Sequence, residues 1–455
     1  MKKRTVIFLF LFSLAIINQA GNSLSAPIAE STSLAAGDAE ATDINEPAPY
    51  SPREVGMSPS ILARIGTIAK GGIKAKAYPG CQILVMKDGK TIYDKSFGHF
   101  TYERKQNVKQ TTMYDLASLS KTTGTLLAIM KLYDEGKIQL TDKISLYLPF
   151  LQGTDKENIT ITELLFHESG LPASLSCSYL AVTKDTSHSI HIGCINYIDT
   201  LVSRTPAADY PLQVSDSFYL HKSFHDSAMH KIANARLRSK TYLYSCVNFI
   251  LLKEIAEAIS GTPMDVFLDS SFYKPMELKN TAYLPLRTHP KEQIAPTLKN
   301  DGLRNGLIQG YVHDPDAALL GGVSGNAGLF ASARDVAKVY QMLLNHGELD
   351  GKRYLSAETC RIFTTTTSAS GRRGLGFDKP VASNPLHSPC CASAPPEVFG
   401  HTGYTGTCCW ADPVNNLVYV FLSNRTYPND GVNKLARLGI RTSIQEVIYQ
   451  SIKQK

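Results

Sequence analysis

The chain has 455 residues, of which 43% are hydrophobic and 19% are charged, and its formal net charge is +7. This length and composition exclude a disordered chain, and the 32 glycines and 23 prolines exclude a coiled coil. Three of the positive charges fall within the first four residues and no basic run follows, so we expect no nucleic-acid partner.

The N-terminus has the pattern of an export signal. Lys2, Lys3 and Arg4 precede an apolar run over residues 6–17, which is too short to span a bilayer comfortably, and small residues follow it. We predict a signal peptide over residues 1–20, and then a linker over 21–50 because that segment is rich in small, acidic and proline residues. After cleavage the protein would be periplasmic or secreted, without a membrane span; an uncleaved membrane anchor is the alternative.

The nine cysteines fit an oxidising compartment and include no CxxC pair, so we expect no metal site. Two candidate disulfides are Cys177 with Cys194, and one of the cysteines at 390–391 with one of those at 408–409. Buried free thiols are the alternative. The histidines between residues 188 and 230 are interpreted as solvated or partner-facing side chains, with a metal site as the alternative.

The first predicted elements are a hairpin and a helix. Residues 82–86 and 90–93 are apolar and β-branched, and they flank Asp88-Gly89, a strong signal for a two-residue turn. The spacing of apolar residues then predicts a helix over 118–137.

The middle of the chain is predicted to be mainly helical. Short helices are expected over 140–170 and a longer one over 244–259, which Gly261 and Pro263 stop. Residues 173–240 are less regular and are interpreted as a long insertion, which we expect to form one wall of a pocket.

The C-terminal part returns to strands. Ser332 and Asp335 suggest a capping box ahead of a helix. Strands are expected over 406–411 and 417–422, and a final helix over 432–452. We therefore predict a single α+β domain over 51–455, in which the last strands pair with the first in one antiparallel sheet flanked by helices, with a helical region inserted.

Ser118 and Lys121 form an S-x-x-K motif at the start of a predicted helix. Residues three apart share one face of a helix, so the lysine can reach the hydroxyl of the serine, which is a poor nucleophile until a base takes its proton. A second copy, Ser271 to Lys274, runs into Pro275 and is interpreted as chance background.

Further motifs follow the first copy in a fixed order. These are Tyr244-Ser245-Cys246 and His401-Thr402-Gly403-Tyr404, together with the runs at 167–172, 321–329 and 410–413. With these motifs the chain resembles the serine β-lactamase and penicillin-binding protein superfamily, most closely its class C β-lactamase-like branch. The resemblance covers roughly residues 52–455, with 173–240 and 379–397 as departures in length, and implies a β-lactamase/transpeptidase-like fold.

The resemblance implies a role for each matched residue. Ser118 would form the acyl-enzyme, Lys121 would activate it, and Tyr244 would share the proton transfer. The backbone N–H groups of Ser118 and Tyr404 would form the oxyanion hole. The substrate-binding candidates are His401, Thr402, Gly403, Tyr404 and Cys246.

Two departures bear on the substrate. Cys246 stands where the family usually has Asn or Asp, and a thiol contacts an amide poorly. His401 replaces a common lysine, and because histidine is only partly charged near neutral pH, its attraction for a substrate carboxylate should be weaker and pH-dependent. Both argue against an efficient β-lactamase.

The sequence thus predicts an exported serine hydrolase that cleaves an amide or ester bond through Ser118, as a D-Ala-D-Ala-type peptidase or esterase. Its substrate would be a cell-wall peptide, an ester or a β-lactam. We expect a monomer without a cofactor. The alternative is a protein of the same fold that binds penicillin or peptidoglycan without turnover.

Overall fold

The computed structural model describes residues 45–46, 48–381, 383–384 and 387–452. The predicted signal peptide and most of the predicted linker lie outside the described residues. Contacts with the domain begin at Asn45, whose side chain exchanges two hydrogen bonds with the backbone of Ser96, and at Glu46, which pairs with Arg334 at 3.0 Å. None of the helices formed by the described residues has the length and apolar character needed to cross a membrane.

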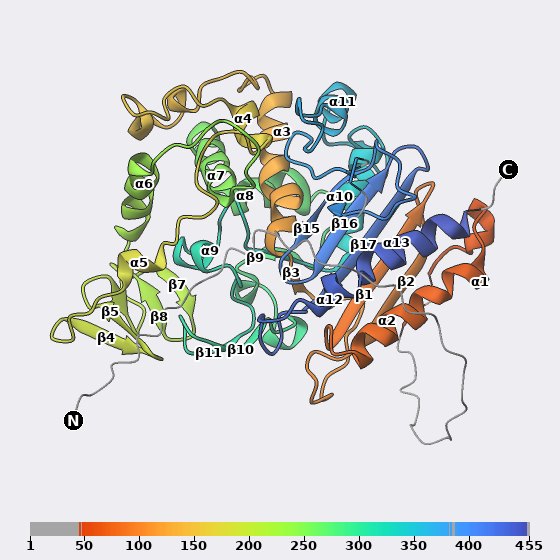
Figure 1. Cartoon of the computed structure of the whole chain (residues 1–455), viewed down its shortest axis with the longest axis horizontal. Helices are drawn as coiled ribbons and strands as arrows, with labels where there is room; N and C mark the ends of the chain where they lie inside the picture. The colour runs from red at the N-terminus through yellow and green to blue at the C-terminus, as the bar shows by residue number, and fades with distance from the viewer. Residues whose placement is uncertain (1–44, 47, 382, 385–386, 453–455) are drawn as a thin grey trace. The chain divides into compact units, whose positions relative to one another are not determined.

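A five-stranded antiparallel sheet, in the order β15–β16–β17–β1–β2, forms one half of the fold (Figure 1). Its strands are β1 (Gly80–Lys87), β2 (Lys90–Gly98), β15 (Phe399–Gly403), β16 (Thr407–Asp412) and β17 (Leu417–Ser423). The predicted hairpin turn is confirmed, because Asp88 and Gly89 have φ values of 53° and 74°, as a type I′ turn requires. The predicted closure is confirmed too, since β17 pairs with β1 along its whole length.

Helices cover both faces of this sheet, and the alternation of side chains along β1 explains why. Ile83 and Val85 point to one face, under α1 (Pro59–Leu62), α2 (Arg64–Lys74) and α13 (Ile440–Ser451). Leu84 and Met86 point to the other, where α10 (Ala333–Leu344) packs. The sheet is therefore buried on both sides, and the α+β class is confirmed.

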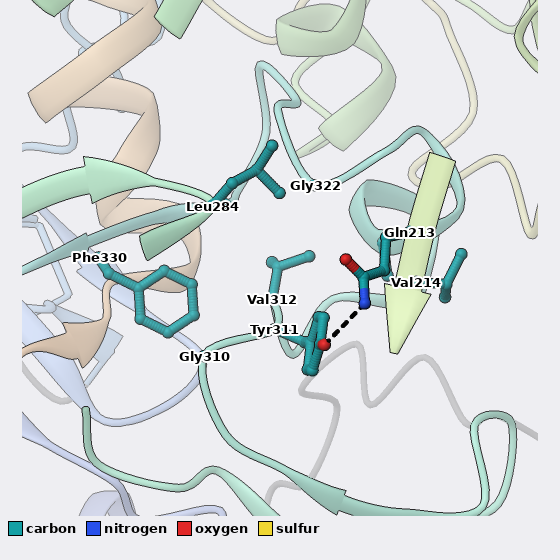
Figure 2. A pocket seen from close by; sticks show the side chains of 10 residues that line it. Gln213, Val214, Leu284, Gly310, Tyr311, Val312, Gly322 and Phe330 are labelled. Atoms are coloured by element: carbon teal, nitrogen blue, oxygen red, sulfur yellow. Dashed lines mark hydrogen bonds between the residues drawn. The ribbon is translucent and has the colours of Figure 1, made fainter. Parts of the chain in front are cut away.

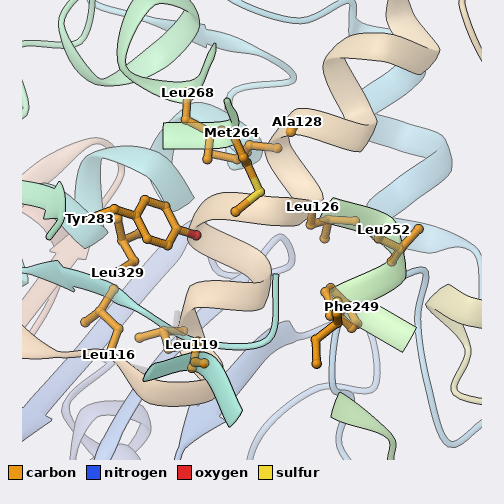
Figure 3. Close-up of a cluster of buried hydrophobic side chains, with 14 of the residues drawn as sticks. Leu116, Leu119, Leu126, Ala128, Phe249, Leu252, Met264, Leu268, Tyr283 and Leu329 are labelled. Atoms are coloured by element: carbon orange, nitrogen blue, oxygen red, sulfur yellow. The ribbon is translucent and has the colours of Figure 1, made fainter. Parts of the chain in front are cut away.

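A helical region with a small sheet forms the other half of the fold. Its elements are α3 (Leu126–Asp134), α4 (Ile161–Leu165), α7 (Cys246–Ser260), α8 (Met264–Leu268), α9 (Pro315–Leu319), α11 (Ala357–Thr365), β3 (Tyr114–Asp115), β9 (Thr281–Tyr283) and β12 (Leu329–Ala331). Apolar side chains from α3, α7 and α8, among them Leu126, Leu252 and Met264, fill its centre (Figure 3). This core fixes the position of the segment that precedes α3.

Two predicted helices differ in detail from the structure. The helix over 118–137 is a 3₁₀ turn, Ala117–Leu119, then a π-helical turn, Lys121–Thr125, and only then α3. The final helix is divided into α12 (Lys434–Arg437) and α13, because Gly439 adopts a φ of 58°.

The predicted capping box before α10 is half formed. Ser332 caps the backbone of Asp335. The Asp335 carboxylate instead accepts hydrogen bonds from Asn280 and Thr281, because an aspartate is one methylene too short to reach back as glutamate does.

The insertion over 173–240 contains strands that the sequence analysis missed. Its elements are α5 (Ser178–Ala181), β4 (Ser189–Ile192), β5 (Ile195–Ile198), β6 (Val202–Ser203), β7 (Leu212–Ser215), β8 (Phe218–Leu220) and α6 (Phe224–Asn234). The inserted region is thus mixed rather than helical. Figure 1 shows these strands at the end of the helical region that is remote from the five-stranded sheet.

A small cavity lies where β7 meets the segment 310–312 (Figure 2). Gln213 donates a hydrogen bond to the Tyr311 hydroxyl beside it at 3.0 Å. The cavity has a volume of about 10 Å³ and holds at most one water molecule. It is therefore a packing gap and not a ligand site. Near it run β10 (Leu298–Asp301) and β11 (Gly306–Ile308), while β13 (Glu348–Leu349) and β14 (Lys352–Arg353) follow α10.

All nine cysteines are free thiols, and seven of them are buried. Cys194 is exposed at the tip of the β4–β5 hairpin, whereas Cys177 is buried. Both candidate disulfides are therefore wrong, and the alternative of buried free thiols describes the structure.

The edge strand β15 lies directly against the turn that carries Ser118. The hydroxyls of Thr405 and Thr407 donate to the carbonyl oxygens of Asp115 and Leu116, at 2.7 and 2.8 Å. A Cβ atom on Gly403 would collide with the carbonyl oxygen of Leu116 and with the Thr407 hydroxyl. Only glycine at 403 lets the sheet edge approach this closely.

We expect Gly403→Ala to lower the free energy of unfolding by about 1–3 kcal/mol and to reduce activity, because backbone atoms must move to admit the methyl group. The matched control is Gly71→Ala at an exposed position of α2, where nothing lies within 4 Å of the added Cβ. That change should instead stabilise by about 0.5–1 kcal/mol. Urea unfolding measures both, and equal effects would contradict the steric account.

Candidate active site

Ser118 lies in a strained turn that a buried carboxylate holds in place. Ala117, the preceding residue, has a φ of 47°, which is unfavourable for a residue with a Cβ atom. The Asp115 carboxylate accepts hydrogen bonds from the backbone N–H groups of Ala117 (2.8 Å) and His313 (2.6 Å). Burial raises the pKa of Asp115 to about 6. An Asp115 carboxylate that is ionised at neutral pH thus stabilises the strained turn through these hydrogen bonds.

Lys121 is fully buried and its ammonium group has three partners. Nζ donates to Ser118 Oγ at 3.1 Å, to the carbonyl oxygen of Asn326 at 2.8 Å and to Cys246 Sγ at 3.6 Å. The predicted contact between the lysine and the serine is therefore present. By contrast, Lys274 of the second motif pairs with Asp269 at the surface, as expected for background.

Lys121 carries the proton in this arrangement. Burial lowers the pKa of Lys121, but Cys246 and Tyr244 raise it by more, and the net shift is upward. Burial raises the pKa of Tyr244 and of Cys246, and Lys121 offsets only part of each shift. At neutral pH the site therefore combines an ammonium with a neutral phenol and a neutral thiol.

Tyr244 lies just before α7, with its ring between two imidazoles. The ring centroids of His167 and His401 lie 4.6 and 5.9 Å from its own. Its hydroxyl is buried and has no hydrogen-bond partner among the described residues. His167 Nδ1 accepts from the Ser245 N–H at 3.1 Å, which places the ring proton on Nε2. A buried phenol without a partner is suited to meeting a substrate atom.

His401 is neutral, which corrects the expectation of partial charge near neutral pH. Burial and the nearby Arg373 lower its pKa to about 3. Its Nδ1 donates to the Thr402 carbonyl oxygen at 2.6 Å, and its Nε2 is buried with no partner among the residues that the structure describes. His401 therefore offers a hydrogen-bond acceptor to the cleft, not a positive charge.

The positive charge comes from two arginines that the sequence analysis missed. Arg373 is 1% exposed, lies 3.1 Å from the Asp378 carboxylate and stacks over the Tyr244 ring at 5.7 Å. Arg372 pairs with the same carboxylate. Because Asp378 pairs through its backbone with Gly400 on β15, this group is fixed to the edge strand. The signal was the adjacent arginine pair just before the departure at 379–397.

These side chains line one cleft of about 320 Å³. Its described lining is Ser118, Tyr242, Tyr244, Arg372, Arg373, Asp378, His401, Thr402, Gly403, Tyr404, Gly406, Arg425, Asn433, Leu435 and Arg441. The insertion over 173–240, which was expected to form a wall, contributes none of them. The cleft instead follows the edge strand to the C-terminal segment.

The other predicted site residues lie on β15, in the turn after it and at the start of α7. Thr402 and Gly403 lie on β15, whereas Tyr404 lies in the turn after the edge strand and is half exposed. Cys246 begins α7, beside Lys121. Asn248 is buried elsewhere and bonds Ser169, so it does not replace the missing amide. Among the described residues no three His, Cys, Asp or Glu side chains gather where they could hold a metal ion.

Comparison with known proteins identifies the family of the chain. The family model for Beta-lactamase matches residues 66–442. A protein of Escherichia coli (strain K12) named "Putative D-alanyl-D-alanine carboxypeptidase" is 31% identical over 418 residues, covering 83% of this chain and 88% of that protein. A protein of the same name from Salmonella gallinarum is 30% identical over 441 residues, covering 89% and 94%.

Solved structures share the fold at low sequence identity. EstCE1, a hydrolase with promiscuous acyltransferase activity, superposes with a TM-score of 0.60 at 19% identity, over 86% of this chain and 99% of its own. A penicillin-binding protein homologue from Caulobacter crescentus does so with a TM-score of 0.59 at 18% identity, over 87% and 99%. These likenesses confirm the β-lactamase/transpeptidase-like fold.

Asp378→Asn should lower the free energy of unfolding by about 3–5 kcal/mol, because it leaves two guanidinium groups without their shared carboxylate in a buried site. Although burial raises the pKa of Asp378, Arg373 and Arg372 lower it by more, so this stabilisation is present at neutral pH and is lost as the pH falls through that depressed pKa. Urea unfolding measures the change. Glu358→Gln, which removes an exposed partner of Arg361, should leave the midpoint almost unmoved. Similar midpoints for both variants would contradict the buried triad.

The His401 ring should stay neutral from about pH 5 to about pH 8, because its pKa is about 3. The folded state binds this proton more weakly than the unfolded chain, so the group's contribution to stability is complete above about pH 6.5 and decreases as the pH falls toward 3. In spectra of ¹⁵N-histidine-labelled protein, the signals lost in His401→Gln should keep neutral-imidazole shifts over that range. A midpoint near pH 6 in those signals would refute the assignment.

Proposed function

Because the chain belongs to the Beta-lactamase family of serine hydrolases, we propose that it is exported and cleaves an amide or ester bond through an acyl-enzyme on Ser118. The observation that carries the proposal is the hydrogen bond from buried Lys121 to Ser118 Oγ beside an unpartnered Tyr244 hydroxyl. Export follows from the N-terminal pattern, which lies outside the described residues.

In the acylation step Ser118 Oγ attacks the substrate carbonyl carbon. Since Lys121 holds its proton at rest, the serine proton must pass to a group that can then deliver a proton to the departing amine or alcohol. The Ser118 proton passes to the Tyr244 hydroxyl oxygen as the phenol proton of Tyr244 passes to the departing amine or alcohol, so the phenol is regenerated. The neighbouring Lys121 ammonium stabilises the negative charge that develops on the phenol oxygen. A water molecule then reverses the sequence and releases the acid.

The negative charge on the carbonyl oxygen needs N–H donors fixed in place. We assign this role to the backbone N–H groups of Ser118 and Tyr404. The contacts that hold the turn against β15, through Thr405 and Thr407, keep these two groups at one location. Gly403 makes that approach sterically feasible.

The substrate class we favour is a peptide with a C-terminal carboxylate, as in D-alanyl-D-alanine. Arg372 and Arg373 share one carboxylate, Asp378, so the group keeps a net positive charge beside Thr402. A carboxylate held there would place the preceding peptide bond along β15 toward Ser118. Relatives named carboxypeptidases support this class.

Cys246 favours a second candidate, a penicillin- or peptidoglycan-binding protein that acylates without turning over. An amide at this position would hold the acyl part of the substrate, and a thiol bonded to Lys121 does so poorly. We expect slow release of a β-lactam rather than efficient hydrolysis.

The test compares Ser118→Ala with Ser271→Ala, the serine of the second S-x-x-K copy. Release of D-alanine from an N-acyl-D-Ala-D-Ala peptide and hydrolysis of a nitrophenyl ester should fall by about 10³-fold or more in Ser118→Ala and remain unchanged in Ser271→Ala. Intact-mass measurement should find one acyl group on the wild type.

The outcomes separate the candidates. Turnover that requires Ser118 establishes the hydrolase. A stable adduct at Ser118 without release of product favours the binding protein. Turnover that survives Ser118→Ala would end both proposals.

A further inference from the structure

The end of the cleft beyond Tyr404 holds a second pair of arginines that the proposed reaction does not use. Arg425 and Arg441 both line the cleft, together with Asn433 and Leu435. They come from the segment after β17 and from the start of α13. Their surroundings differ from those of Arg372 and Arg373, which share a carboxylate.

Arg425 is held rigidly and is still missing a partner. Its side chain is 5% exposed, its Nε donates to the Tyr404 carbonyl oxygen at 2.6 Å, and its guanidinium plane lies over the Tyr404 ring at 4.2 Å. Its Nη1 is buried and has no hydrogen-bond partner within the described part of the chain. A buried guanidinium N–H without an acceptor is costly, so an acceptor from outside the chain is expected at this point.

Arg441 adds a second positive charge to the same place. Its Nη1 donates to the Thr407 carbonyl oxygen at 2.8 Å, and it is close enough to Arg425 to lower the pKa of that group. Asp430 lies nearby, but it accepts a hydrogen bond from the Tyr404 hydroxyl at 3.3 Å. Among the residues that the structure describes, no carboxylate forms an ion pair with Arg425 or Arg441. Asp430 acts on Arg425 only at longer range, and two neighbouring guanidinium groups without an ion-pair partner are typical of an anion site.

The two arginine pairs lie at opposite ends of β15. Asp378, with Arg372 and Arg373, is paired to Gly400 at one end of β15, and Arg425 is bonded to Tyr404 at the other end. Four residues of extended strand separate these points, which is about 13 Å at 3.3 Å per residue. The turn that carries Ser118 packs against the last residue of β15, Gly403, and against Thr405 and Thr407 after it.

We propose that Arg425 and Arg441 bind a carboxylate on the acyl part of the substrate, so that the preferred peptide carries one negative charge on each side of the bond attacked by Ser118. The inference rests on the proposed function for the orientation of the peptide, with its C-terminal carboxylate beside Arg372 and Arg373. An extended peptide along the edge strand would then direct its acyl group to Arg425. The planar fork of a guanidinium group matches a carboxylate in two hydrogen bonds.

The test measures binding to Ser118→Ala by calorimetry, so that it does not depend on turnover. The probes are pairs of N-acyl-D-Ala-D-Ala peptides whose four- to six-carbon acyl chains end in either a carboxylate or a carboxamide. The carboxylate member of at least one pair should bind about tenfold tighter, and the ratio should decrease as salt is added. Equal affinities within every pair would overturn the proposal.

Second-site variants locate the preference. Adding Arg441→Gln, or Arg425→Gln if its melting temperature is retained, should reduce the ratio of affinities to about one, and Arg441→Lys should keep part of it. The matched control is Arg437→Gln, an exposed arginine on α12 that does not line the cleft. A ratio that survives in Arg441→Gln, or that collapses equally in Arg437→Gln, would overturn the assignment.

Turnover is scored separately with Ser118 intact. If neither peptide releases D-alanine while the carboxylate preference persists in binding, the proposed function fails and the anion site stands. If both peptides are cleaved with equal kcat/KM, the anion site fails and the proposed function stands.

Discussion

The buried ammonium group of Lys121 is the constraint on which the centre of this molecule depends. Removing an ammonium ion from water costs several kcal/mol unless its protons are all hydrogen-bonded. The three acceptors come from three separate parts of the chain: the turn of Ser118, the start of α7 at Cys246 and the glycine-rich loop at Asn326. Stabilising this one charge therefore requires that the serine turn, the start of α7 and the loop all be correctly placed. A Cβ atom on Gly325 would collide with the backbone of Phe249 in α7. Glycine at 325 therefore allows the loop to lie close to α7.

Around that charge the cleft separates proton chemistry from substrate attraction. His401, His167 and Tyr244 are buried and neutral, and each has a polar atom that no other described residue pairs with. The permanent charges are guanidinium groups, which do not lose their protons at any ordinary pH. Where the family commonly has one lysine at the edge strand, this chain has a neutral imidazole and places its positive charge farther along the strand.

The sequence was sufficient for whatever depends on local pattern and on motif order. The hairpin at Asp88-Gly89, the closure of the sheet and the contact of Ser118 with Lys121 all follow from spacing. The sequence alone did not predict which distant segments lie close together in the fold. Arg373 and Arg425 lie outside every recognised motif, on either side of the one at His401, and only the fold brings them into one cleft with Ser118.

Two other differences have physical causes that a periodicity cannot reveal. The π-helical turn after Ser118 keeps helical spacing while it shifts the ladder of hydrogen bonds, so a helix was the natural expectation. In the insertion, strands of two to four residues are too short for their alternation to stand out, although Gly193 between two isoleucine-rich runs was a usable turn signal.

The pairing of β1 with β17 has a consequence for how the chain acquires its structure. The two strands are joined only after more than three hundred intervening residues have been made, and β1 has no neighbour but β2 until then. Loops of this length close slowly. Until β17 pairs with β1, a hairpin with an apolar surface on each face is prone to associate with other chains. The serine turn, which packs against β15, also depends on strands made near the end of the chain. Truncation near the C-terminus should therefore abolish more than the final helix: it removes the strands that convert an exposed hairpin into a sheet.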